Sequence, residues 1–131
     1  MQSEKTNTGK PAWKILVVED DSDISGLIKL LLDMDGHTVQ TANNGKDALL
    51  FLERNKFDLV TTDFSMTGMR GDTLATTIKE RLPNQPVLMI STNGALAKAS
   101  GEPLPGVDLV MGKPFSQEEL REAIVKVLSG K

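Results

Sequence analysis

The sequence predicts an α/β domain in which helices cover both faces of a parallel sheet. Five short apolar runs alternate with segments of helical periodicity, and each run ends at a polar or charged residue. A helix between two strands returns the chain to the same edge of the sheet, so consecutive strands should run parallel with right-handed crossovers. Because the 131 residues show neither an internal repeat nor a linker, we interpret them as one domain.

The order of the first elements follows from their periodicity and their end signals. After the apolar run 15–18, residues at helical spacing over 24–32 predict a first helix, which Gly36 can close in a left-handed conformation. An alternating strand is expected over 37–42. Asn44 is then the expected N-cap of a second helix.

The second half of the chain continues this alternation. A glycine-bearing loop over 66–71 leads into a third helix, which two prolines end. Only residues 95–100 have a helical pattern in the next segment, so a fourth helix should be short or frayed. The last helix begins with a capping box formed by Ser116 and Glu119. The remaining apolar runs are 59–62, 87–90 and 109–112.

The composition argues against several classes of partner. The balance of 15 basic and 18 acidic residues gives a net charge of −3, too small to attract nucleic acid or a membrane surface by charge alone. The chain has no cysteine, which excludes a disulfide framework and a thiolate metal site and leaves the redox compartment undetermined. It has no apolar run of transmembrane length and no hydrophobic signal core, so we expect a soluble cytoplasmic protein. Residues 1–12 are polar and lack a period, which predicts a flexible N-terminal tail before a domain at 13–131.

Four of the five strand ends carry groups that can handle a phosphoryl group. Because the carboxyl ends of parallel strands share one edge of the sheet, we expect these groups to converge there. Two carboxylates about 4 Å apart repel by roughly 4 kcal/mol at an effective dielectric of about 20, so proton uptake or a hard cation such as Mg²⁺ must offset the charge. An aspartate beside that cation could attack a phosphoryl donor, while an amine and a hydroxyl hold the phosphoryl oxygens. The groups are Glu19, Asp20, Asp63, Ser91 and Lys113.

Five short motifs succeed one another along the chain. They are the acidic pair in Val17-Val18-Glu19-Asp20-Asp21, the strand from Asp58 to Asp63, the loop from Met66 to Gly71, the hydroxyl of Ser91 and the run Lys113-Pro114-Phe115. In this order and spacing they resemble the receiver domain of two-component response regulators, over residues 14–128. The resemblance is specific, since five separate motifs agree.

The resemblance implies both a fold and an activity. The fold would be a flavodoxin-like (βα)5 three-layer sandwich whose parallel sheet has the strand order 2-1-3-4-5. Asp63 would accept a phosphoryl group from the phosphohistidine of a sensor histidine kinase or phosphotransfer protein, assisted by Lys113 and Ser91. The domain would then switch conformation and signal to a downstream protein target. It would not be an enzyme with a separate substrate, because it catalyses only its own phosphorylation and dephosphorylation.

The same resemblance implies a metal site. Mg²⁺, or Mn²⁺ in its place, would be held by Asp20, Asp63 and the backbone carbonyl of Ser65, while Glu19 would reach the ion through water. The resemblance also implies a cis peptide bond before Pro114, a conformation that is tolerated mainly before proline.

Three residues depart from the pattern of this family. Val110 stands where the family often carries an aromatic side chain whose rotamer changes with phosphorylation. Thr67 replaces a proline that is common in the loop after the acceptor. Thr92 replaces a small residue after the switch hydroxyl. These departures concern signal transmission, and the phosphoryl chemistry is expected to be intact.

Three other functions fit parts of the pattern. A dehalogenase-type phosphatase would need a second aspartate where Ser65 stands, and a flavin carrier would need a hydroxyl- and glycine-rich phosphate loop where acidic residues follow the first strand. An unphosphorylated pseudo-receiver, acting as a protein interaction module, is the third alternative. Asp58 should lie at the opposite end of its strand from Asp63, and His37 at the start of an outer strand, so neither is expected to act chemically.

Overall fold

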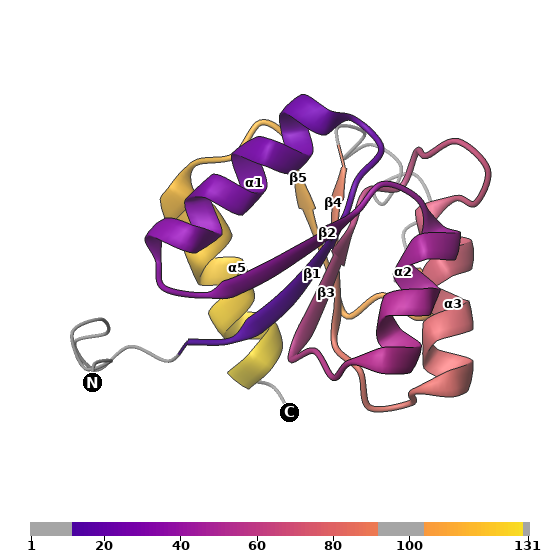
Figure 1. Cartoon of the computed structure of the whole chain (residues 1–131). Coiled ribbons are helices and arrows are strands. Elements are labelled where there is room, and N and C mark those ends of the chain that lie inside the picture. Colours follow the sequence, from indigo (N-terminus) through magenta and orange to yellow (C-terminus); the bar gives the residue numbers. More distant parts are fainter. Residues whose placement is uncertain (1–11, 92–103, 130–131) are drawn as a thin grey trace.

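The apolar runs form a five-stranded parallel sheet, and the helices of the described residues lie on both of its faces (Figure 1). The computed structural model describes residues 12–91 and 104–129. The strands are Lys14–Val18 (β1), Thr38–Ala42 (β2), Leu59–Thr62 (β3), Val87–Ser91 (β4) and Leu109–Gly112 (β5). The described helices are Ser22–Met34 (α1), Gly45–Arg54 (α2), Gly71–Arg81 (α3) and Gln117–Ser129 (α5).

Some sequence expectations fall outside the described ranges. These are residues 1–11 of the tail predicted at 1–12, the weak helix at 95–100 and Thr92. Within the described ranges, none of the helices is both long and apolar enough to cross a membrane.

The strand order is β2-β1-β3-β4-β5, and every neighbouring pair is parallel. This confirms the predicted flavodoxin-like order 2-1-3-4-5. The register pairs Val18, the last residue of β1, with Ala42 on one side and Thr62 on the other. The residues that follow these strands therefore start from one edge of the sheet.

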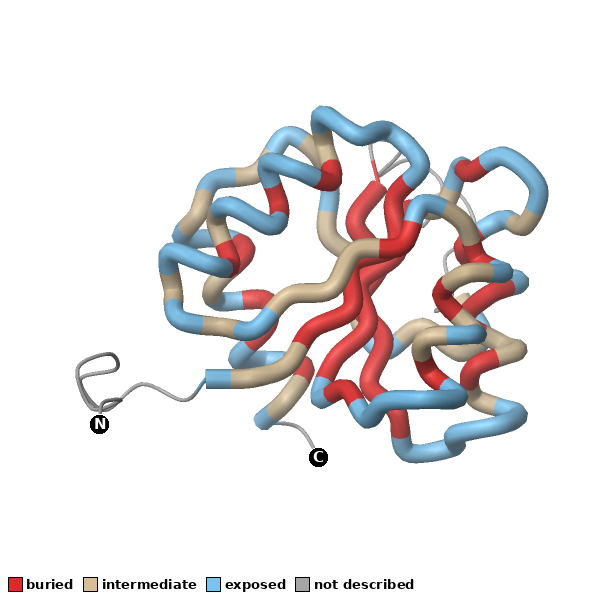
Figure 2. The backbone as a smooth tube through the Cα atoms, in the orientation of Figure 1, coloured by how far each residue is buried: buried red, intermediate tan, exposed pale blue. Residues whose placement is uncertain are grey.

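Alternation along the strands divides the core into two layers. Ile15 and Val17 of β1 pack with apolar residues of α1 and α5, whereas Leu16 and Val18 pack with those of α2 and α3. All four side chains are at most 1% exposed, and full burial of each contributes about 1.5–3 kcal/mol. Figure 2 shows the mostly buried strands β1, β3 and β4 in the centre, with many exposed residues on the helices around them. The sheet edge is thus supported from both faces.

Side-chain caps begin three of the described helices, and those at Asn44 and Ser116 confirm the expectation from the sequence. The side chain of Asp21 accepts hydrogen bonds from two backbone N–H groups in the first turn of α1, and Asn44 accepts one from Asp47 at 2.7 Å. Ser116 and Glu119 cap α5 reciprocally, with backbone-to-side-chain distances of 3.0 and 2.9 Å. Each cap satisfies backbone donors that the helix itself leaves without a partner.

The strand expected over 37–42 begins at Thr38, because His37 packs against the residue that precedes β1. The backbone N–H of Trp13 donates to His37 Nδ1 at 3.0 Å, and the two rings stack with centroids 5.5 Å apart. Partial burial lowers the pKa of His37, while the negative charge of Asp35 pulls it in the opposite direction. The neutral ring is therefore the form that the fold favours.

Gly26 offers a test of whether helix propensity limits stability in α1. It lies in the exposed part of the helix, and a Cβ atom added there would meet nothing within 4 Å. Gly26→Ala should therefore raise the free energy of unfolding by about 1 kcal/mol, measured by urea denaturation. Gly36→Ala is the matched control and should lower it, since Gly36 has a φ of +90°. A loss of stability in Gly26→Ala would contradict the helix assignment at that position.

Acidification should weaken the fold through His37. Because the pKa is lowered in the folded state, its contribution to stability is complete above the usual value of 6.5 and is lost as the pH falls through the folded-state pKa. Between about pH 7.5 and about pH 5.5 the wild type should lose more unfolding free energy than His37→Gln, whose amide does not titrate. Urea unfolding followed by the fluorescence of Trp13, the only tryptophan, measures both proteins. Equal losses would exclude His37 as the cause.

Candidate functional site

The predicted site residues extend the strands at the carboxyl edge of the sheet. The backbone N–H of Glu19 donates to the last residue of β2 at 3.0 Å, and that of Asp63 donates to the last residue of β1 at 3.2 Å. The backbone N–H of Lys113 donates to the last residue of β4 at 2.9 Å. Each residue is therefore fixed by the neighbouring strand, which places side chains from distant parts of the chain at one edge.

Three carboxylates meet at this edge. Glu19, Asp20 and Asp63 each offer one oxygen, and these oxygens lie within 4.8 Å of one another. Glu19 is 3% exposed and Asp63 is 9% exposed, whereas Asp20 is exposed to solvent. The cluster therefore has a buried floor and one side open to an approaching group.

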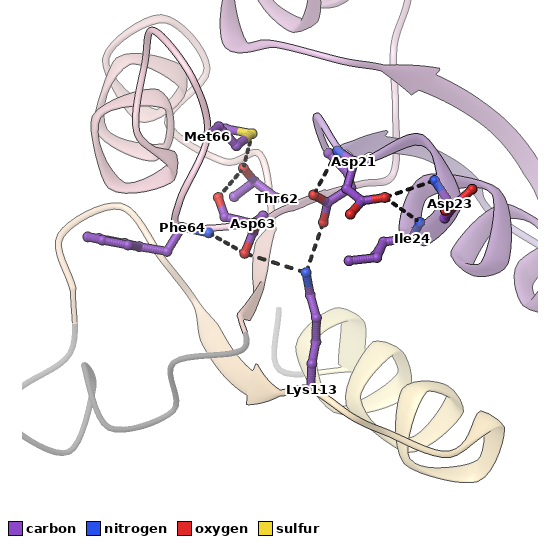
Figure 3. A network of polar contacts seen from close by, with 9 residues as sticks. Asp21, Asp23, Ile24, Thr62, Asp63, Phe64, Met66 and Lys113 are labelled. Atoms are coloured by element: carbon purple, nitrogen blue, oxygen red, sulfur yellow. Dashed lines mark hydrogen bonds and ion pairs between the residues drawn. The ribbon is translucent and has the colours of Figure 1, made fainter.

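Lys113 reaches into this cluster from the end of β5 (Figure 3). Its ammonium nitrogen lies 3.0 Å from Glu19 Oε1 and 3.6 Å from Asp63 Oδ1, and its side chain is 8% exposed. The Lys113-Pro114 peptide bond is cis, as the resemblance implied. A nearly buried ammonium group thus contacts both of the nearly buried carboxylates.

Backbone groups complete the contacts of the two carboxylates that Lys113 reaches. Asp63 Oδ1 accepts a hydrogen bond from the backbone N–H of Phe64 at 2.9 Å, and Glu19 Oε2 accepts one from Asp21 at 3.2 Å. Burial nevertheless raises the pKa of Glu19, because loss of water outweighs the opposing hydrogen bond and charge of Lys113. The negative charge of Asp63 also raises it.

The donor set fits a hard divalent cation. Three carboxylates face one ammonium group, so negative charge remains in excess when all three are ionised. Ions such as Mg²⁺ prefer oxygen ligands and are commonly held by one or two carboxylates together with water and phosphate. Glu19, Asp20 and Asp63 supply that kind of ligand, and the exposure of Asp20 gives the ion a route of entry.

The two serines of the predicted site lie at the same edge of the sheet. Ser91 ends β4 and is 2% exposed, and its carbonyl oxygen accepts the hydrogen bond from Lys113. Ser65 lies exposed in the loop that follows Asp63. The hydroxyl of Ser91 and the carbonyl of Ser65 keep their expected roles as predictions.

Two residues around Asp63 matter in ways that the sequence did not indicate. The hydroxyl of Thr62 donates to the Asp63 carbonyl oxygen at 2.9 Å. A Cβ atom added at Gly71 would lie 1.9 Å from that same oxygen, and the backbone N–H of Gly71 donates to Phe64 at 2.8 Å. The start of α3 therefore packs directly on the peptide of Asp63. The loop glycine was visible in the sequence, but its contact with Asp63 was not.

Asp58 lies where the sequence placed it, at the opposite end of β3 from Asp63. Its carboxylate accepts a hydrogen bond from the backbone N–H of Lys14 at 2.8 Å, and its own N–H donates to the Lys14 carbonyl at 2.8 Å. These contacts join the starts of β1 and β3. Asp58 therefore has a structural role, as does His37.

Comparisons with known proteins agree with this geometry. The family model described as "Response regulator receiver domain" matches residues 15–125. The chain is 36% identical to the chemotaxis protein CheY-3 of Vibrio cholerae, over 87% of the chain and 90% of that protein. It is 35% identical to the transcriptional regulatory protein GlrR of Escherichia coli, over 88% of the chain but only 26% of that protein.

A solved structure with the same architecture is that of the response regulator TrrA from Thermotoga maritima in complex with Mg²⁺-BeF. It superposes with a TM-score of 0.79 at 29% identity, covering 88% of this chain and 98% of that one. Response regulators receive signals from histidine kinases or phosphotransfer proteins and act on downstream effectors. The family match over most of the chain shows that this protein belongs to the response regulator receiver domains, the signalling modules of two-component systems.

Proposed function

We propose that this chain accepts a phosphoryl group on Asp63 from the phosphohistidine of a sensor histidine kinase or phosphotransfer protein in the cytoplasm, and then signals to a protein partner. The observation that carries the proposal is the position of Lys113, whose ammonium lies 3.0 Å from Glu19 and 3.6 Å from Asp63. The chain spans only part of GlrR but most of CheY-3. Because these relatives differ in length and in name, they support the class of the phosphoryl donor and of the target protein and not their identity.

The proposed metal ligands are Asp20, Asp63 and the backbone carbonyl of Ser65, with Glu19 acting through water. The support is the oxygen cluster itself and the likeness to TrrA, a structure with bound Mg²⁺-BeF. When bound, Mg²⁺ or Mn²⁺ would neutralise charge on the carboxylates and on the incoming phosphoryl oxygens.

The nucleophile in this proposal is the carboxylate of Asp63. Its Oδ1 accepts from Phe64 and faces Lys113, which leaves Oδ2 to attack phosphorus. A bond forms between this oxygen and phosphorus, the bond from phosphorus to the donor imidazole nitrogen breaks, and the electron pair returns to the ring. The product is a mixed anhydride on Asp63.

Two further residues would hold the transferred group. The Lys113 ammonium would exchange its contact with Glu19 for a phosphoryl oxygen, a charge-assisted hydrogen bond of the stronger kind. The Ser91 hydroxyl would donate to another phosphoryl oxygen. Both groups start from adjacent strand ends, since the backbone N–H of Lys113 already donates to the carbonyl of Ser91.

Phosphorylation can be tested without knowing the natural donor. In excess Mg²⁺, a small acyl phosphate should add one phosphoryl group to the wild type, detected by intact-mass spectrometry. Asp63→Asn should lose the adduct because the nucleophile is gone. Asp58→Asn, at the other end of the same strand, should retain it, and a chelator should suppress the reaction in both reactive proteins.

Two outcomes would contradict the proposal. Modification of Asp63→Asn would place the acceptor elsewhere. Absence of an adduct on the wild type, from both an acyl phosphate and a phosphohistidine donor, would favour the unphosphorylated pseudo-receiver.

Lys113 should also be needed for stability. Lys113→Met leaves the nearly buried carboxylate of Glu19 without its cation, so in chelator at neutral pH the free energy of unfolding should fall by about 3 kcal/mol. The loss should shrink as the pH approaches 4.5, because the pKa of Glu19 is already raised and rises further without the ammonium. Glu19→Gln in the same background should recover most of the stability. If Glu19→Gln changed the free energy of unfolding by the same amount in the wild type and in Lys113→Met, the two residues would not be coupled.

A further inference from the structure

The carboxylate of Asp20 is held by a part of the chain far from its own strand. The backbone N–H of Thr67 donates to Asp20 Oδ2 at 2.9 Å, a contact between residues 47 positions apart. Asp20 is the exposed member of the carboxylate cluster. Glu19 and Asp63 each have Lys113 and a neighbouring backbone N–H as partners. In the described part of the chain, the hydrogen bond from Thr67 is the one that orients Asp20.

The loop that presents this N–H is fixed on both sides of Thr67. Met66 is 8% exposed and belongs to the core between the sheet and the α2 and α3 helices, and Met69 packs against the same core. The loop is closed by the hydrogen bond from Gly71 to Phe64 at 2.8 Å. The donor therefore comes from an anchored segment, although Thr67 itself is exposed.

A carboxylate has two oxygens, and this hydrogen bond uses one of them. Oδ2 of Asp20 accepts from Thr67, while Oδ1 remains available to a cation. A hydrogen bond to the outer oxygen of a ligating carboxylate fixes its rotamer and lowers the cost of orienting it when the ion arrives. The contact depends on the peptide N–H and not on the threonine side chain.

We propose that the backbone N–H of Thr67 is a positioning group for the divalent cation, acting through Asp20, and that it links cation binding to the loop after the phosphoacceptor. The inference rests on the proposed metal-dependent function. Proline has no amide hydrogen, so a chain with proline at this position lacks the donor. Thr67 therefore gives the proposed metal site of this chain a backbone hydrogen bond that a chain with proline at this position cannot make.

The test compares two variants at one position. Thr67→Pro removes the N–H, whereas Thr67→Ala removes the hydroxyl and retains the N–H. The dissociation constant for Mg²⁺, measured by titration calorimetry on the unphosphorylated protein, should rise about tenfold in Thr67→Pro. This is the lower end of the effect expected when a group that supports a metal ligand is lost. Thr67→Ala should bind Mg²⁺ as the wild type does.

A second measurement does not depend on the proline variant folding. In the wild type, the Thr67 amide should exchange slowly with solvent, and its NMR signal should shift during Mg²⁺ addition with the same midpoint as binding. Asp20→Ala should accelerate that exchange, while the amide of Gly71, bonded to Phe64, should stay protected. A Thr67 amide that neither shifts with Mg²⁺ nor responds to Asp20→Ala would overturn the inference.

The outcomes separate this inference from the proposed function. If the wild type binds Mg²⁺ and folded Thr67→Pro binds it equally or more tightly, the positioning role is wrong and the proposed function stands. If the wild type binds no divalent cation, the metal-dependent part of the proposed function fails as well.

Discussion

The balance of charge at the carboxyl edge of the sheet is the constraint on which the site depends. Glu19 and Asp63 are nearly buried, and Lys113 supplies an ammonium group to both. Charges removed from water are tolerated only when partners are held in good geometry. That geometry requires β1, β3 and β5 to end together, which the parallel register of the sheet ensures. The fold and the chemistry of the site therefore share one requirement.

The position of a residue along its strand decides whether it can take part. Asp58 and Asp63 flank the same short strand, and both are aspartates. At the entry to β3, Asp58 joins backbone groups of Lys14. At the exit, Asp63 meets Glu19 and Lys113. Sequence reasoning separated the two because strand direction follows from the alternation of helices and strands, and direction alone identifies the edge where side chains converge.

The contacts that the sequence did not predict are those between loops and strand ends. Thr67 appears in the sequence as one polar residue in a loop, and nothing local shows that its N–H meets Asp20. Gly71 appears as a turn glycine, yet its lack of a side chain matters because α3 begins against the Asp63 carbonyl. Lys113 was expected to hold phosphoryl oxygens, and the structure pairs it with Glu19. Such pairings depend on how far each side chain or loop reaches into the site, and the periodicity of the sequence does not specify this.

The excess of negative charge has opposite effects on stability and on binding. Burial raises the pKa of Glu19, so the folded state accommodates its ionised form at a cost. Any cation that binds only the folded protein offsets that cost and stabilises the fold by mass action. The same excess draws Lys113 toward Glu19, while a phosphoryl group on Asp63 would draw it away. In our proposal, the partner of Lys113 therefore reports the occupancy of the site, because one ammonium group cannot neutralise both Glu19 and a phosphorylated Asp63.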